Sequence, residues 1–324
     1  MEPPFRMHLR AHGTVTKFFA ELKDAPKNPS LALCTSTVLF VLSQDRLNMD
    51  LDRESLELML NLLDTDSRIK DALDGAGLNP RELEKNKSKV QELVAAMKAK
   101  GRATNLSLDH ISADHLAMET LLSMTSKRAG EWFKEELREL GGLDHLVRTM
   151  SDCLSFLTAD EISIWTEPLH NKLKKVDRVL KVLESVTHEN EENCQYLLEY
   201  EEGKFLDTIH SFYKLLDEEV PLNSDVSSHM GSQIVLEKED KDSVAYTLRE
   251  SLLDIIRVYI NLVHDYKSIP HGSRLSGEKE GIFDLCLHGM FVIPHYLPEE
   301  KRFDILVLTL TLIINLVENC YPNR

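Results

Sequence analysis

Histidine and carboxylate residues are the groups in this sequence that could do chemistry, and their spacing argues against a catalytic or metal site. His8 and His12 are four residues apart. They would share one helix face as two metal ligands would, but no cysteine or carboxylate completes a ligand set beside them. The Asp-His pairs at 109–110 and 114–115 combine an acid with a base. Adjacent side chains on a helix point in different directions, and neither pair stands in a nucleophile motif. We interpret both pairs as helix caps or turn residues.

Motifs for phosphate binding, dinucleotide binding, ester hydrolysis and zinc-dependent proteolysis do not occur in the sequence. There is no GxxxxGK[ST] loop, no GxGxxG turn, no GxSxG elbow and no HExxH helix. We therefore predict a protein that is not an enzyme and that holds no cofactor and no metal ion. Its function must then come from surfaces that bind other proteins.

A second group of polar residues could form such a surface. In helical repeat proteins, one helix of each repeat lines the concave binding face. The helix expected over residues 115–126 carries His115 and Glu119 on its polar side, with Lys127 and Arg128 at its end. Trp132 lies off the apolar stripe of the next helix, so it is either an aromatic anchor for a partner or an ordinary surface residue. We predict these five residues as partner-binding residues, and we expect charge reversal at Glu119 or Lys127 to leave thermal melting unchanged.

Composition and charge narrow the partners and the compartment. The formal net charge of -16 opposes direct nucleic-acid binding, because phosphates are held by clustered lysine and arginine. The densest basic run, residues 172–181, is interpreted as a solvated helix face. No stretch reaches the roughly 20 apolar residues that a membrane span needs, and the first ten residues lack an apolar signal core. Five cysteines without a CxxC pair fit a reducing compartment, the nucleus or the cytoplasm.

Residues 116–150 show the helices that must position these side chains. Positions 117, 118, 121, 122 and 125 form one stripe with helical spacing, and they are mostly apolar. A second stripe, from Phe133 to Leu140, stops at the glycine pair 141–142, because glycine commonly closes a helix in the left-handed conformation. A third stripe begins at Leu143. Helices this short cannot bury an apolar face alone, so they need neighbouring copies of themselves.

The same order of short helix, glycine, helix and long apolar helix recurs at Gly13, Gly142, Gly203 and Gly281. We predict an all-α solenoid of armadillo or HEAT type with about five irregular repeats. Residues 1–324 would form a single domain with an N-terminal lobe, 1–150, and a C-terminal lobe, 151–324. Polar and acidic composition predicts mobile loops near residues 64–90, 217–245 and 266–280.

Several strings are more specific than a generic helical repeat. They include FRMHLRAHGTVTKFF, DRLNMDLDRESLEL, HLAMETLLSMTSKRAGEWFKEELRELGGLDHLV, VLKVLESVTHENEENCQYLLEY and LPEEKRFDILVLTLTLIINLVEN. Together they resemble the C-terminal module of the wings apart-like (WAPL) proteins, the cohesin release factors. The resemblance covers nearly the whole chain. Residues 154–175 and 217–245 look unlike the family.

The resemblance implies a non-enzymatic nuclear regulator that unloads cohesin from chromatin. Its partners would be the cohesin kleisin, the HEAT-repeat subunit, the SMC heads and a Pds-type cofactor. Family members also carry an N-terminal arm whose Phe-Gly-Phe motifs dock that cofactor, and their helical module extends beyond both ends of this sequence. The alternative interpretation is a general armadillo-like scaffold, a truncated paralogue without releasing activity.

Overall fold

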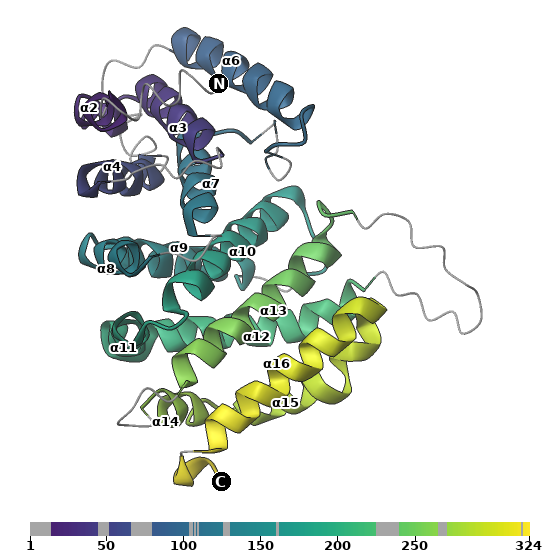
Figure 1. Ribbon diagram of the computed structural model, residues 1–324. Helices are drawn as coiled ribbons and strands as arrows, with labels where there is room; N and C mark the ends of the chain where they lie inside the picture. The colour runs from purple at the N-terminus through teal and green to yellow at the C-terminus, as the bar shows by residue number, and fades with distance from the viewer. Residues whose placement is uncertain are drawn as a thin grey trace. The chain divides into compact units, whose positions relative to one another are not determined.

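The computed structural model is built from helices (Figure 1). It describes residues 14–44, 52–65, 80–103, 106, 108, 110–125, 130–159, 162–224, 240–264, 271–318 and 320–324. Every regular element in these ranges is a helix, which confirms the predicted all-α helical repeat fold. None of the described helices is long and apolar enough to cross a lipid bilayer.

The chain divides into two compact units, Met1–Lys127 and Arg128–Arg324. The predicted border between lobes, at residues 150 and 151, falls inside α9 (Gly142–Leu157). Helix α9 packs against α8, α10 and α12, all in the second unit. A helix whose neighbours all lie in one unit cannot be divided between two, so the border moves to 127.

The first unit is organised around α3 (Pro29–Ser43), which packs against α4 (Arg53–Leu63), α6 (Pro80–Lys98) and α7 (Ala113–Thr125). Two shorter elements, α2 (Thr14–Ala20) and η1 (Ala25–Lys27), complete the described part of the unit. Asn28 caps the start of α3, since its side-chain oxygen accepts hydrogen bonds from the backbone N–H groups of Ser30 and Leu31. The core joins α3 to α6 and α7 through Leu33, Phe40, Val90, Val94 and Leu116.

The second unit repeats one three-helix pattern. In each repeat a short helix is followed by a middle helix and then by a long one, and consecutive long helices pack against each other. The repeats are α8 (Glu131–Glu139), α9 and α10 (Glu167–Thr187); α11 (Glu191–Glu199), α12 (Lys204–Leu222) and α13 (Val244–Val263); and α14 (His271–Gly277), α15 (Ile282–Phe291) and α16 (Glu299–Glu318). The 3-10 turns η2 (Tyr200–Gly203), η3 (Ile293–Tyr296) and η4 (Tyr321–Asn323) complete the unit.

A glycine in the left-handed conformation precedes each middle helix. The φ angles are 74° at Gly141, 96° at Gly203 and 83° at Gly281, a region that side chains disfavour. The prediction for 203 and 281 holds, but in the first of these repeats the residue is Gly141. Its neighbour Gly142 begins α9, where an added Cβ would lie 2.5 Å from a methyl carbon of Leu137. The predicted equivalent, Gly13, lies outside the described residues.

Parts of the predicted loops are helical. Helix α6 begins at Pro80, inside the predicted loop 64–90, because it packs on α3. Helix α12 extends to Leu222 and α13 begins at Val244, so both enter the predicted loop 217–245. Likewise α10 begins at Glu167, within the stretch 154–175 that looked unlike the family. The remaining parts, 66–79, 225–239 and 265–270, lie outside the described residues.

Helix α14 falls within the third predicted loop, 266–280, and tertiary contacts explain it. An added Cβ at Gly272 would lie 1.9 Å from the carbonyl oxygen of Leu262, so this helix needs glycine to approach α13. The Ser273 hydroxyl hydrogen-bonds to the carbonyls of Val263 and Asn315. The helix is therefore held by α13 and α16, and its polar sequence does not reveal it.

Candidate partner-binding surface

Of the five predicted partner-binding residues, the structure describes His115 and Glu119 on α7 of the first unit and Trp132 on α8 of the second. Lys127 and Arg128 lie outside the described residues. His115 lies near the start of α7, with Nδ1 3.1 Å from the carbonyl oxygen of His110 and Nε2 3.9 Å from Glu119 Oε1. Trp132 lies on α8 and is 46% exposed, which leaves it available to a partner.

Glu119 needs a correction. It is only 7% exposed, on a helix that packs against both α3 and α4. Its carboxylate therefore belongs to the interior of the first unit and is not offered to a partner. Charge reversal here would place a cation in a packed site, so for this residue the structure predicts a lower melting temperature in place of the unchanged melting expected from the sequence.

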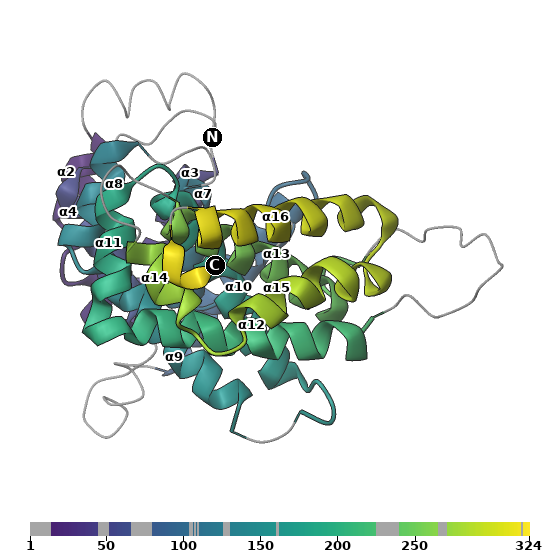
Figure 2. The ribbon, with the colours of Figure 1, turned by 90° about the horizontal axis from the view of Figure 1, so that it is seen from below.

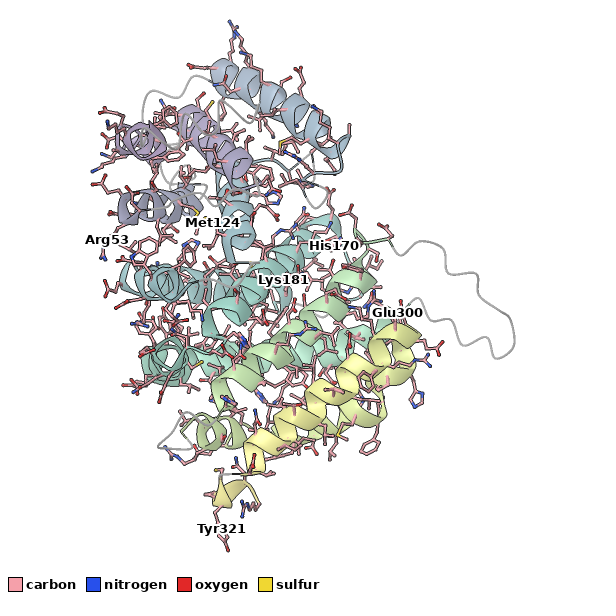
Figure 3. All side chains as sticks on the ribbon, in the orientation of Figure 1. Arg53, Met124, His170, Lys181, Glu300 and Tyr321 are labelled. Carbon is pink, nitrogen blue, oxygen red and sulfur yellow. The ribbon has the colours of Figure 1, made fainter. Side chains whose placement is uncertain are left out.

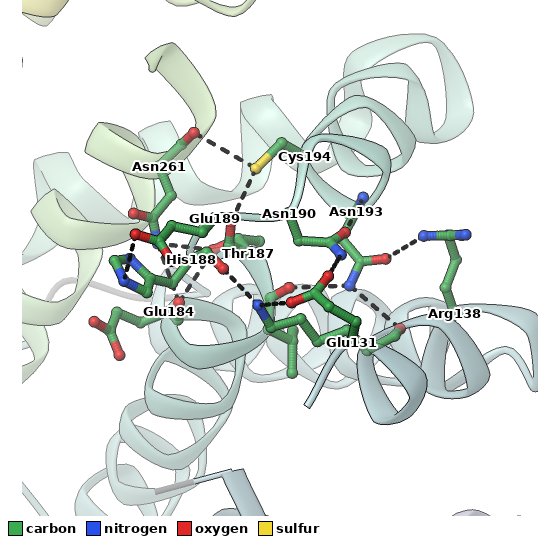
Figure 4. Close-up of polar contacts among 12 residues, drawn as sticks. Glu131, Arg138, Glu184, Thr187, His188, Glu189, Asn190, Asn193, Cys194 and Asn261 are labelled. Carbon is green, nitrogen blue, oxygen red and sulfur yellow. Dashed lines mark hydrogen bonds and ion pairs between the residues drawn. The ribbon is translucent and has the colours of Figure 1, made fainter. Parts of the chain in front are cut away.

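A buried polar junction connects the first two repeats of the second unit (Figure 4). Lys134 of α8 is 5% exposed, and its ammonium donates to Glu131 at 2.9 Å and to the His188 carbonyl at 2.7 Å. The hydrogen bond from Lys134 lowers the pKa of Glu131, and a hydrogen bond from Asn190 acts in the same direction. These contacts fix α8 to the end of α10 and to the turn that follows it.

Asn193 of α11 lies at the centre of this junction and is fully buried. Its amide donates to the carbonyls of Lys134 and Val186, and its oxygen accepts from Arg138 at 2.7 Å. On the other side, Asn261 of α13 donates to the carbonyl of Glu184 on α10 at 3.1 Å. The junction thus holds the long helices α10 and α13 in a fixed register.

That register places four charged residues together between α10 and α13, which we call the ionic row: Asp177, Lys181, Asp254 and Arg257. Lys181 Nζ lies 2.6 Å from Asp177 Oδ1 and 3.8 Å from Asp254 Oδ2. Arg257 Nη1 lies 2.6 Å from Asp254 Oδ1. Figure 3 labels Lys181 on the surface of α10. The row therefore alternates acid and base across two consecutive repeats, between residues that are far apart in sequence.

The carboxylates and the cations of the ionic row differ in burial. The side chains of Asp177 and Asp254 are 10% and 8% exposed, whereas those of Lys181 and Arg257 are 34% and 33% exposed. Burial raises the pKa of Asp254 to about 6, and the nearby Asp177 acts in the same direction, while Lys181 and Arg257 oppose it. The row therefore places two partly exposed cations over two buried acids, with each cation paired to an acid of the row.

Sequence reasoning missed this row, although a signal was present. Asp177 stands between Val176 and Val179, and Asp254 between Leu253 and Ile255, so both carboxylates interrupt apolar stripes. A carboxylate in such a position is buried only with a partner. The partner was not visible, because 72 residues lie between Lys181 and Asp254 in the sequence. Within the described residues, no three His, Cys, Asp or Glu side chains gather as a metal site requires.

Comparison with known proteins adds what the geometry alone does not provide. The profile of the family described as "Wings apart-like protein regulation of heterochromatin" matches residues 1–323. The chain belongs to the wings apart-like family. It is 42% identical to the Drosophila melanogaster protein wings apart-like over all of its own length. It is 41% identical to the human wings apart-like protein homolog over 99% of its length. A Caenorhabditis elegans wings apart-like homolog is 22% identical over the whole chain.

The match covers only part of each wings apart-like relative. The chain spans 18% of the Drosophila protein and 26% of the human one. The ionic row, the polar junction and the three repeats described above therefore all lie within the segment that is shared with these relatives.

Proposed function

We propose that this chain is a non-enzymatic regulator of the association of cohesin with chromatin, and that it acts by binding cohesin subunits. The observation that carries the proposal is the family match over residues 1–323, whose description names regulation of heterochromatin. A helical repeat array is suited to this role because it offers an extended surface to another protein. The chain would act in the nucleus on chromatin, and also occur in the cytoplasm.

The proposed partners are the kleisin, the HEAT-repeat subunit and the SMC heads of cohesin, together with a Pds-type cofactor. The ionic row is the proposed contact, since long helices of two repeats present there two positioned cations, Lys181 and Arg257, on either side of Asp254. A single acidic side chain of a partner would bind there, between Lys181 and Arg257. Direct contact with nucleic acid or membrane is not part of the proposal, because the net charge of -16 disfavours anionic polymers and surfaces.

The binding step can be tested with purified components. The immobilised chain is expected to retain a recombinant complex of kleisin and HEAT-repeat subunit, and the bound fraction should saturate. Failure to retain the kleisin complex, the SMC heads and the Pds-type cofactor would contradict the proposal.

The role of the ionic row can be tested at constant net charge. A variant with Asp177→Asn, Lys181→Gln, Asp254→Asn and Arg257→Gln removes two acids and two bases while it keeps the hydrogen-bonding groups. A matched control removes two exposed ion pairs elsewhere in the unit, Lys204 with Glu201 and Arg274 with Glu278. The first variant should lose partner retention and the control should keep it. Equal retention by both would show that the partner binds another surface.

A second function fits the same fold. A helical repeat array can bind partners through its surface without any further activity, so the alternative proposal is a general armadillo-like scaffold that binds partners without releasing cohesin. An unloading assay on DNA-bound cohesin separates the two. Release by the chain alone supports the first function, and retention of partners without release supports the second.

A further inference from the structure

The two buried acids of the ionic row are satisfied to different degrees. Asp177 accepts hydrogen bonds from Lys181 Nζ at both carboxylate oxygens, at 2.6 and 2.5 Å, and one from the Ser251 hydroxyl at 3.5 Å. Asp254 accepts a hydrogen bond from Arg257 Nη1 at Oδ1, at 2.6 Å. Its Oδ2 is buried and accepts no hydrogen bond from the described residues. The charge of Asp254 is therefore the costlier of the two to keep buried.

Asp254 also limits what the two cations of the row can bind. Its carboxylate is hydrogen-bonded to Arg257, and its Oδ2 lies 3.8 Å from Lys181 Nζ. The row contains two acids and two bases, so their formal charges cancel. An acidic side chain that approaches the exposed parts of Lys181 and Arg257 therefore meets no net positive charge, and it competes with Asp254 for the guanidinium.

The charges around Asp254 come from α10 and from α13 itself. Helix α13 packs against α10, α11, α12, α14 and α16, and Figure 2 shows the middle helices α12 and α15 on one side of the long helices α13 and α16. The described groups whose charge acts on Asp254 are Asp177, Lys181 and Arg257. The neighbouring helices meet α13 at other positions: His170 of α10 at Thr247, Lys301 of α16 at Glu250, His210 of α12 at Tyr259, Cys194 of α11 at Asn261, and Ser273 of α14 at Val263.

These contacts bear on how the ionic row binds a partner, and the inference rests on the proposed function, in which an acidic side chain binds between Lys181 and Arg257. We propose that Asp254 is an autoinhibitory contact: its carboxylate occupies Arg257 and offsets the charge of Lys181, and loss of its charge opens both cations to the partner. Asp177 keeps Lys181 in place in either state, because it holds the ammonium through both oxygens. The opened row has two bases for one charged acid.

A proton can remove this charge without breaking a hydrogen bond. Oδ2 of Asp254 is free to carry the proton, while Oδ1 keeps the hydrogen bond from Arg257. Burial raises the pKa of Asp254 from 3.8 to about 6, and the nearby Asp177 raises it further, while Lys181 and Arg257 oppose the shift. Asp254 is therefore charged near neutral pH, and the row opens as the pH falls through about 6.

The test compares the unsubstituted chain with Asp254→Asn, which removes the charge and keeps the size of the side chain. The probe is the recombinant complex of kleisin and HEAT-repeat subunit, titrated against each immobilised chain. At about pH 7.5 the variant should bind about fivefold or more tightly, the ratio that corresponds to two unit charges about 4 Å apart in water. At about pH 5.5 the ratio of the two affinities should fall towards one, because Asp254 is then mostly protonated.

Two further variants locate the effect in the row. Glu278→Gln is the matched control, since Glu278 pairs with Arg274 at 3.4 Å on the surface of α14. It changes the net charge by the same amount and frees an arginine elsewhere, so the affinity should not change. Arg257→Gln combined with Asp254→Asn should lose the gain, because the cation that Asp254 occupied is gone. The histidines His170 and His210 are present in every variant, so their titration cancels in the ratios.

Three outcomes would overturn the proposal and leave the proposed function standing. They are binding by Asp254→Asn at about pH 7.5 that is no tighter than that of the unsubstituted chain, an equal gain in Glu278→Gln, and a ratio of affinities that is the same at both pH values. Failure of every chain to bind the complex would overturn the proposed contact, and this inference with it.

Discussion

The close packing of α15 on α16 requires a residue without a side chain at Gly289. An added Cβ at Gly289 would lie 2.7 Å from Thr309 Cγ2. Thr309 is fully buried, and its hydroxyl donates to the Ile305 carbonyl at 2.6 Å, which holds the methyl group in place. Gly289→Ala therefore forces two helices apart, although alanine is the better helix former.

The magnitudes are set by opposing effects. Overpacking a core by one methyl group lowers the free energy of unfolding by about 1 to 3 kcal/mol. Replacing a glycine inside a helix by alanine raises it by about 1 kcal/mol. The single variant should thus lose up to about 2 kcal/mol of unfolding free energy. Thr309→Ser alone removes a buried methyl group and should cost about 1 kcal/mol.

The double variant separates the steric cause from any other. Thr309→Ser removes the methyl group that meets the new Cβ and keeps the hydroxyl and its hydrogen bond. Gly289→Ala with Thr309→Ser should therefore be more stable than the sum of the single changes by about 1 to 3 kcal/mol. Urea unfolding of the four proteins measures this coupling free energy, and thermal melting should show about 2 to 4 °C per kcal/mol.

A control keeps this test interpretable. An added Cβ at Gly130 meets nothing within 4 Å, so Gly130→Ala should show no coupling with Thr309→Ser. If Gly289→Ala and Thr309→Ser prove additive within about 0.5 kcal/mol, the close contact does not govern the packing of α15 on α16, and the reasoning fails.

Three further predictions concern single residues. The pKa of Asp254 is raised to about 6 from 3.8. The free energy of unfolding should therefore fall as the pH rises from about 4 through 6, because the buried carboxyl loses its proton. Asp254→Asn should be as stable as the unsubstituted chain near pH 4 and more stable by up to about 3 kcal/mol at pH 7. Urea unfolding across that range tests this, and an unchanged pH profile would contradict it. Asn193→Ala should lower the free energy of unfolding by about 2 to 3 kcal/mol, because the buried carbonyls of Lys134 and Val186 lose their hydrogen-bond donor. If urea unfolding shows a smaller loss than an exposed substitution gives, the junction does not hold the repeats together. Glu119→Lys should lower the melting temperature while Trp132→Ala leaves it nearly unchanged, since the exposed fractions are 7% and 46%; the opposite order would show that α7 is packed differently.

Local features of the chain could be predicted from sequence because their causes are local. The helices at 113–125 and 299–318 follow from apolar spacing, and the left-handed turns at Gly203 and Gly281 follow from the residue type. The order of short, middle and long helix follows from the recurrence of that pattern. The family was also visible, because specific strings rather than general composition carry it.

Tertiary structure decided the features on which the candidate surface depends. Glu119 looked exposed on its own helix, but it is buried, on a helix that packs against both α3 and α4. The polar helices α6 and α14 form because neighbouring helices supply their contacts. The ionic row exists because α10 and α13 pack against each other. A sequence determines which residues share a face of a helix, but burial and charge pairing are properties of the neighbours, and these come together only when segments distant in sequence fold against one another.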